Sequence, residues 1–83
     1  MSFKTPTHAR LWYKWIDRLA TASVTGDAIT VHVYNMALYD LNHVYDTTNP
    51  QSLEAMTRYW ENIHTACPNL PADAIAADIR GEL

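Results

Sequence analysis

Five apolar side chains between residues 53 and 67 recur at alternating steps of three and four residues, and this spacing constrains the fold more than any other feature of the chain. They are Leu53, Met56, Trp60, Ile63 and Cys67. Because an α-helix has 3.6 residues per turn, the spacing places all five in one narrow stripe. A stripe of this kind has to be buried against other helices. The pattern therefore predicts a helix over about residues 50–67, inside a helical domain.

Two further long segments and one short segment are also predicted to be helices. Residues 6–22 begin with Thr5 as an N-cap and Pro6 in the first position, where the missing N–H of proline does no harm. The stretch 28–34 is locally ambiguous, because alternating β-branched residues also suit a strand. The longer window 28–46 keeps helical periodicity, so we expect one helix there. A short last helix is expected over residues 71–80.

We therefore predict an all-α fold, a small helical bundle of three main helices plus a short C-terminal helix. Eighty-three residues leave room for a single domain over 1–83, with a thin core that large aromatic side chains help to fill. The side chains expected to face inward, besides the stripe of residues 53–67, are Leu11, Trp12, Trp15, Ile16, Leu19, Val33, Tyr34, Ala37, Leu38, Leu41, Val44, Tyr45, Ile75 and Ile79.

The chain carries no recognisable catalytic motif. Cys67 falls in the apolar stripe, where a small buried hydrophobe is the simplest reading. Two glycines in the whole chain exclude a phosphate-cradling loop, and no serine occupies a nucleophile elbow. We therefore expect neither an enzyme nor a cofactor. A single cysteine and the lack of a long apolar run favour the cytoplasm and argue against a membrane protein.

One pair of motifs resembles the metal-binding pattern of carboxylate helical bundles. Asp40 precedes His43 by three residues, and Glu61 precedes His64 by three residues. Di-iron bundles use such pairs on facing helices, with the ligands projecting into the core. The helical projection turns His43 away from the apolar arc and leaves His64 at the edge of its stripe. A metal site therefore remains a second alternative, and we assign no metal ligand.

The charge of the chain is polarised. Residues 1–20 hold four basic residues against one acid, a net +3, whereas the rest holds two against eight, a net −6. Arg10, Lys14 and Arg18 share one face of the first helix. That face suits water, the acidic helices of the same chain, or an acidic partner surface. The strongly acidic remainder argues against nucleic acid as a partner.

Tyr39 and Tyr13 project among polar residues, and an exposed tyrosine is a good interface anchor. Tyr39 lies one turn from Asn35 and one turn from His43, and it shares an exposed helical face with His32. The candidate partner-binding residues are Tyr39, His32, His43, Asn35, Tyr13, Arg10, Lys14 and Arg18.

These observations predict a small non-enzymatic protein-binding module that associates stoichiometrically with a larger protein. An inhibitor, an adaptor or an accessory subunit would fit, including the small inhibitors that mobile elements carry. The main alternative is a homo-oligomeric structural protein, such as a homodimer, whose thin core is completed by a second copy.

Overall fold

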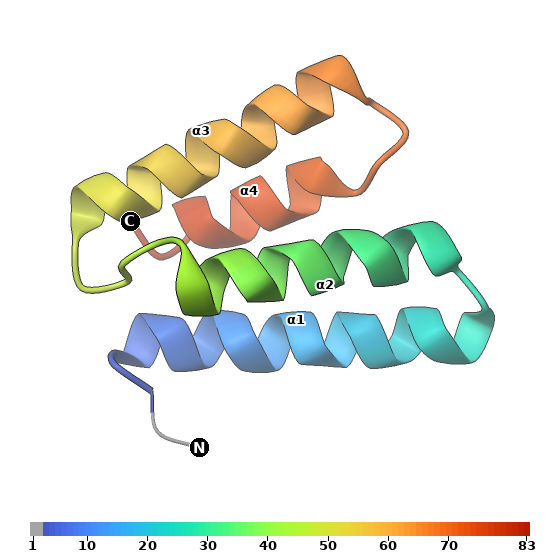
Figure 1. Cartoon of the computed structure of the whole chain (residues 1–83), viewed down its shortest axis with the longest axis horizontal. Coiled ribbons are helices and arrows are strands. Elements are labelled where there is room, and N and C mark those ends of the chain that lie inside the picture. Colours follow the sequence, from blue (N-terminus) through green and yellow to red (C-terminus); the bar gives the residue numbers. More distant parts are fainter. Residues whose placement is uncertain (1–2) are drawn as a thin grey trace.

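The computed structural model describes residues 3–83, and these form four helices (Figure 1). The helices are α1 (Pro6–Thr25), α2 (Ala28–His43), α3 (Pro50–Ala66) and α4 (Ala72–Arg80). No strand occurs within this described part, so the all-α prediction is confirmed. The ambiguous stretch 28–34 lies inside α2.

The four helices pack as two pairs of consecutive helices. α1 packs along α2, and α3 packs along α4, so the chain forms two helical hairpins. In Figure 1, α4 runs between α3 and α2, and α2 lies between α4 and α1. In the second hairpin α4 is the shorter helix, with only 9 residues.

Side-chain caps start three of the helices, and the cap at Thr5 is the one predicted above. The hydroxyl of Thr5 accepts a hydrogen bond from the backbone N–H of His8, and Pro6 takes the first position of α1. The carboxylate of Asp27 caps α2, and the side-chain oxygen of Asn49 caps α3 just before its own proline.

α1 is three residues longer than predicted. The stretch after Ala22 was expected to break the helix, yet the hydroxyls of Ser23 and Thr25 donate to backbone carbonyls one turn earlier. Such bonds keep these polar side chains within a helix. The helix stops at Gly26, whose φ of 75° is the left-handed conformation that favours glycine.

α2 and α3 are shorter than predicted, and two residues beyond them are placed differently as a result. α2 ends at His43, and Val44, expected to be buried, is 57% exposed. α3 ends at Ala66, so Cys67 leaves the apolar stripe and becomes an exposed C-cap residue. The predictions for Val44 and Cys67 assumed that each helix continued through these residues. Because the backbone turns where each helix ends, both side chains are redirected.

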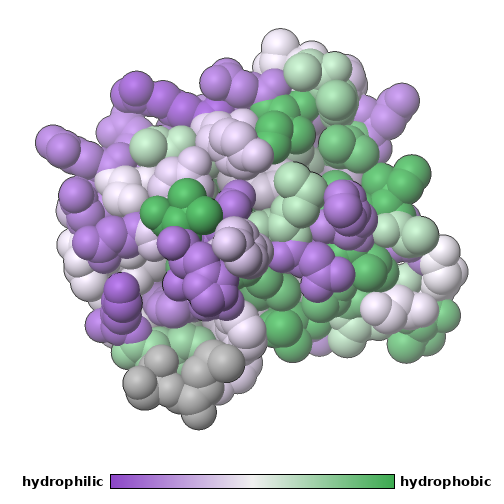
Figure 2. All heavy atoms as spheres, viewed as in Figure 1, coloured by the Kyte–Doolittle hydropathy of each residue, from purple (hydrophilic) through white to green (hydrophobic). Residues whose placement is uncertain are grey.

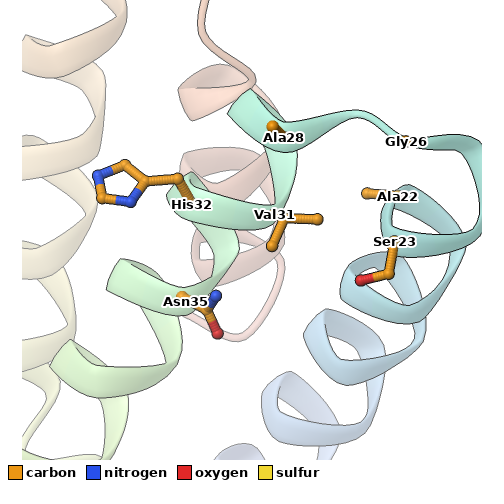
Figure 3. A pocket seen from close by; sticks show the side chains of 7 residues that line it. All are labelled: Ala22, Ser23, Gly26, Ala28, Val31, His32 and Asn35. Carbon is orange, nitrogen blue, oxygen red and sulfur yellow. The ribbon is translucent and has the colours of Figure 1, made fainter.

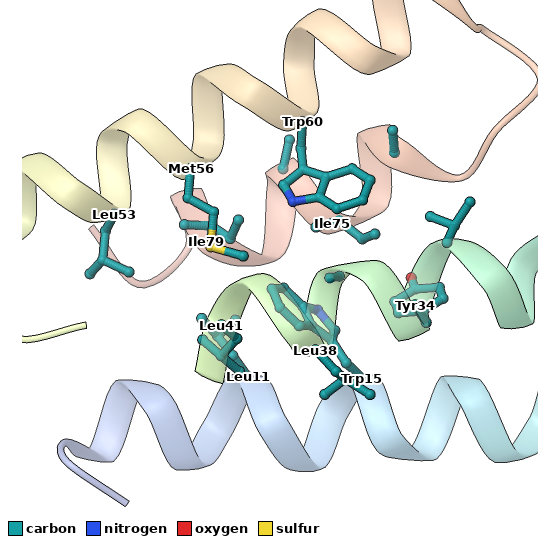
Figure 4. Close-up of a cluster of buried hydrophobic side chains, with 14 residues drawn as sticks. Leu11, Trp15, Tyr34, Leu38, Leu41, Leu53, Met56, Trp60, Ile75 and Ile79 are labelled. Atoms are coloured by element: carbon teal, nitrogen blue, oxygen red, sulfur yellow. The ribbon is translucent and has the colours of Figure 1, made fainter. Parts of the chain in front are cut away.

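The core lies between the two hairpins and draws on all four helices (Figure 4). Its fully buried large side chains include Leu11 and Trp15 of α1, Leu41 of α2, Met56 and Trp60 of α3, and Ile75 and Ile79 of α4. Trp12, Leu19, Tyr45 and Ile63 are half-buried against this cluster. Ile16 was expected to be inside but is 36% exposed.

None of the helices in the described residues combines the length and the apolar character that crossing a bilayer would require.

Candidate functional site

One face of α2 carries a stripe of side chains that stays exposed in the described part of the chain. Its members are Ile29, His32, Met36, Tyr39 and His43, at steps of three, four, three and four residues. All five are exposed, and Tyr39 and Ile29 have 62% and 60% of their surface in solvent. We call these five residues the α2 stripe. Apolar faces of a helix are ordinarily buried against other elements. Because the α2 stripe stays exposed, it is an unpartnered surface.

The aromatic end of the stripe is organised within α2 itself. The rings of Tyr39 and His43 lie with their centroids 4.8 Å apart and their planes tilted by 47°. Asn35 is exposed one turn before Tyr39. The predicted exposure of Tyr39, Asn35, His32 and His43 is therefore confirmed, and the four lie on one helix.

His32 stands at the border of two hollows. One hollow, of about 430 Å³, lies between the end of α1 and the start of α2 and is lined by Ala22, Ser23, Gly26, Ala28, Val31, His32 and Asn35. In Figure 3, the imidazole of His32 extends from α2 away from Ser23 on α1. The same side chain also lines the second hollow, on the opposite side of the stripe.

The second hollow is an apolar groove between α2 and α3, with a volume of about 460 Å³. We call it the α2–α3 groove; its lining residues are Ala28, Ile29, His32, Val33, Met36, Trp60, Ile63 and Leu70. His32 is the one ionisable side chain among them. In Figure 2, hydrophobic residues gather on the right-hand half of the face, and polar residues dominate the left-hand half.

Asp40 is the one carboxylate in α2, which contains no lysine or arginine. It lies one turn beyond Met36 and is half-buried. Its carboxylate makes no hydrogen bond or ion pair with the described residues, and burial raises the pKa of this carboxyl. Burial, and after it the charge of Asp40, also raises the pKa of the nearby Tyr45.

Tyr13 is exposed as predicted, but it belongs to a different neighbourhood. Its ring packs edge-on against Phe3, with the centroids 5.6 Å apart, and Phe3 also contacts His8 and Trp12. Tyr13 is thus part of an aromatic cluster at the start of α1 and not of the α2 stripe.

The basic face of α1 meets acidic groups at the end of the same chain. Arg10 forms an ion pair with Glu82 at 2.6 Å, and Lys14 lies 3.8 Å from Asp78. Arg18 forms a close ion pair with Asp78 as well. One of the three roles considered for this face, the complement to the acidic helices, is therefore observed for Lys14 and Arg18, which pair with α4, while Arg10 pairs with Glu82 just beyond it.

Asp78 joins three elements through one carboxylate. It accepts a hydrogen bond of 3.0 Å from the indole N–H of the buried Trp15, and Arg18 bridges it to the hydroxyl of Tyr34 on α2. Burial raises the pKa of Tyr34, and its neutral hydroxyl accepts the hydrogen bond from Arg18. This network holds α4 against the first hairpin.

The four residues of the metal hypothesis do not converge. Glu61 pairs with Arg80 of α4, and His64 faces the hollow between α3 and α4. Across residues 3–83, no group of three or more His, Cys, Asp or Glu side chains could hold a metal ion. The hypothesis of a site built from Asp40, His43, Glu61 and His64 therefore finds no support in the geometry.

Sequence reasoning found the polar part of the stripe but missed the groove. The groove needs Met36 and Ile29 from α2 together with Ile63 and Leu70 from the second hairpin, so it depends on how the hairpins pack. One signal was present: Ile29 and Met36 fall at helical spacing with His32 and Tyr39, outside the predicted apolar arc.

Comparison with protein-family models, with curated proteins and with solved structures gives no match to this chain. The candidate site is therefore argued from its own geometry and chemistry.

Proposed function

We propose that this chain is a small non-enzymatic protein-binding module that associates stoichiometrically with a larger protein, as an inhibitor, an adaptor or an accessory subunit. The contact surface in this proposal is the α2 stripe together with Asn35. The scaffold behind it is a small helical bundle, whose two hairpins hold α2 with one face outward.

One observation carries the proposal: α2 keeps an exposed stripe of apolar and aromatic side chains almost free of charge. Interface centres are depleted in charged residues and enriched in tyrosine and methionine, and Tyr39 and Met36 supply both types here. Tyr39 offers a large rigid ring at a low cost in conformational entropy. The ring of His43 lies beside it, tilted by 47°.

The basic residues of α1 are less available to a partner than the α2 stripe. Arg10, Lys14 and Arg18 are engaged by Glu82 and Asp78, so an acidic partner would have to displace these contacts. Tyr13 remains exposed on α1 and offers a comparison residue of the same type. The α2 stripe is thus the preferred contact surface, and Tyr13 marks the second candidate.

The test is a native mass spectrum of the tagged chain purified gently from its own host, followed by the variants Tyr39→Ala and Tyr13→Ala. We expect a complex with a larger protein that Tyr39→Ala weakens at least tenfold and that Tyr13→Ala leaves within twofold. Both tyrosines are exposed, so both variants should unfold at the urea concentration of the parent.

The outcomes separate the alternatives. A bare chain under all gentle conditions contradicts the proposal, and a doubled chain favours the homo-oligomer. A complex that tolerates Tyr39→Ala but not Tyr13→Ala moves the contact surface to α1.

A further inference from the structure

The α2–α3 groove has the size and lining of a site for an apolar side chain. Its volume of about 460 Å³ falls in the range of about 300–1,000 Å³ typical of binding pockets. Its floor includes the buried Val33 and Trp60, and its rim includes the exposed Ile29 and the partly exposed Met36. The described chain leaves this apolar lining open to solvent, which favours an occupant that removes it from water.

A single unpaired charge stands beside the groove. Asp40 follows Met36 by one turn on α2, half-buried and without an ion-pair or hydrogen-bond partner in residues 3–83. Tyr45 lies close enough for the charge of Asp40 to raise its pKa, after the larger effect of burial. A half-buried carboxylate without a partner is a favourable place for an ammonium or guanidinium group, which gains an ion pair there.

Within residues 3–83, the lysines and arginines are engaged away from Asp40. Arg10, Lys14, Arg18, Arg58 and Arg80 each lie within ion-pair distance of a carboxylate other than Asp40. The remaining basic residue, Lys4, acts on Asp46, whose pKa is lowered by hydrogen bonds from Thr48 and also by the charge of Lys4. No lysine or arginine of the described residues is left to complement Asp40, and this favours a cation supplied by another molecule.

We infer that the larger partner inserts an apolar side chain into the α2–α3 groove and places a lysine or arginine of the same segment against Asp40. This inference rests on the proposed function and names the chemistry of the partner at the same site. Val33 in the groove and Asp40 are seven residues apart on α2, which is about 10 Å along the helix axis. On a helical partner the anchor and the cation are thus about seven residues apart, and on an extended partner about three.

A second copy of the chain fits this site less well than a basic-rimmed partner. The chain has a net charge of −3, and its five paired basic side chains would have to leave their carboxylates to reach Asp40. Two copies would also bring their unpaired acids together, which costs association energy at low salt.

The experiment places the photo-reactive residue p-benzoylphenylalanine at position 36 of the intact chain in its own host. Position 36 lies on the rim of the groove. The cross-linked peptide of the captured protein is then sequenced. We expect an apolar residue at the cross-link, with lysine or arginine three or seven positions away.

Charge variants provide the decisive comparison. Asp40→Lys should lower the cross-linking yield at least tenfold, and Asp40→Asn should lower it less and reduce its dependence on salt. Asp17→Lys is the matched control, because Asp17 is an exposed acid of α1 outside the groove and its substitution changes the net charge equally. We expect this control to stay within twofold of the parent. If Asp40→Lys fails to fold by circular dichroism, Asp40→Asn alone decides the comparison through its salt dependence.

Each other result overturns the inference in a distinguishable way. Capture of a second copy through position 36 makes the chain its own occupant. Capture of a larger protein with equal yields from Asp40→Lys and Asp17→Lys removes the cation but leaves the proposed function standing. A bare chain in the native mass spectrum, with no cross-link at position 36, removes both.

Discussion

At the scale of single residues, the two most buried tryptophans differ in how their polar atoms are satisfied. Trp15 and Trp60 are both almost completely buried, at 0% and 1% exposure. The indole N–H of Trp15 donates to Asp78, whereas the N–H of Trp60 is buried without a hydrogen-bond partner among the described residues. A buried donor without a partner costs free energy that a packed apolar ring of similar shape avoids.

This difference predicts unequal effects of the same substitution. Trp15→Phe removes a hydrogen bond to a charged acceptor, while Trp60→Phe removes an unsatisfied donor, and both leave a cavity of similar size. We expect Trp15→Phe to lower the free energy of unfolding by about 1–2 kcal/mol more than Trp60→Phe. Urea unfolding followed by circular dichroism measures both. Equal losses would mean that the Trp15–Asp78 bond contributes nothing net.

Prediction of burial from sequence was better inside the helices, where Ile16 of α1 is an exception, than at the helix ends. Ile75 and Ile79 are fully buried as expected, and Tyr39 is exposed as expected. Val44 and Cys67 were assigned inward, yet both fall just beyond a helix end. The apolar spacing alone did not say where each helix would stop.

At the scale of elements, the turn between α1 and α2 depends on one backbone conformation. Gly26 has a φ of 75°, and its N–H closes α1 by bonding to the carbonyls of Ala22 and Ser23. A Cβ added at this position would meet no atom within 4 Å, so sterics with neighbours play no part. The cost of a side chain there is the intrinsic cost of the left-handed conformation.

We therefore predict that Gly26→Ala lowers the free energy of unfolding by about 1–2 kcal/mol, and that Gly26→Asn costs less because asparagine tolerates this conformation. Thermal unfolding of both variants checks the order. Gly81→Ala is the matched control: its φ is −65°, and an added Cβ would make ordinary contacts of 3.5 Å. A larger loss for Gly81→Ala would contradict the assignment of the cost to backbone conformation.

The elements also show why the candidate site was only partly predictable. The four predicted residues of α2 (His32, Asn35, Tyr39 and His43) share one helix, and helical periodicity alone places them together. The groove and the ion pairs between α1 and the C-terminal residues join side chains that are far apart in sequence, such as Arg10 and Glu82, which are 72 positions apart. Their partners depend on how one hairpin docks on the other, which no local pattern specifies.

At the scale of the whole molecule, polar bridges from α1 to the C-terminal residues connect the two hairpins. Hydrogen bonds from the Arg10 side chain lower the pKa of Glu82 below its usual 4.5. The unfolded chain then binds a proton at Glu82 more readily than the folded protein does. The stability from this pair is fully present above about pH 4.5 and is lost as the pH falls through the lower folded pKa.

This linkage predicts that Glu82→Gln destabilises the protein at pH 7 by about 0.5–1 kcal/mol and has a much smaller effect at pH 3. Urea unfolding at the two pH values measures the difference. Glu54→Gln is the control, because the Glu54–Arg58 pair is exposed at both ends and lies within one helix. We expect its effect to stay near 0.3 kcal/mol. An effect of Glu82→Gln that is independent of pH would show that the ion pair is not its source.

Asp40 has the opposite linkage, and this ties the stability of the fold to the proposed contact surface. Burial raises the pKa of Asp40 above its usual 3.8, so the folded protein holds this proton more tightly than the unfolded chain. The ionised carboxylate therefore costs stability at pH values above the folded pKa, and the cost disappears below about pH 3.8.

Replacing Asp40 by asparagine removes that cost. We predict that Asp40→Asn raises the free energy of unfolding at pH 7 and has almost no effect at pH 3, which urea titrations at both values will show. The same variant should bind the partner more weakly, because the carboxylate that destabilises the free protein gains a cation in the complex. A variant that is less stable than the parent at pH 7 would mean that Asp40 has an intramolecular role in the fold. Its unpaired charge would then no longer argue for a cation on the partner.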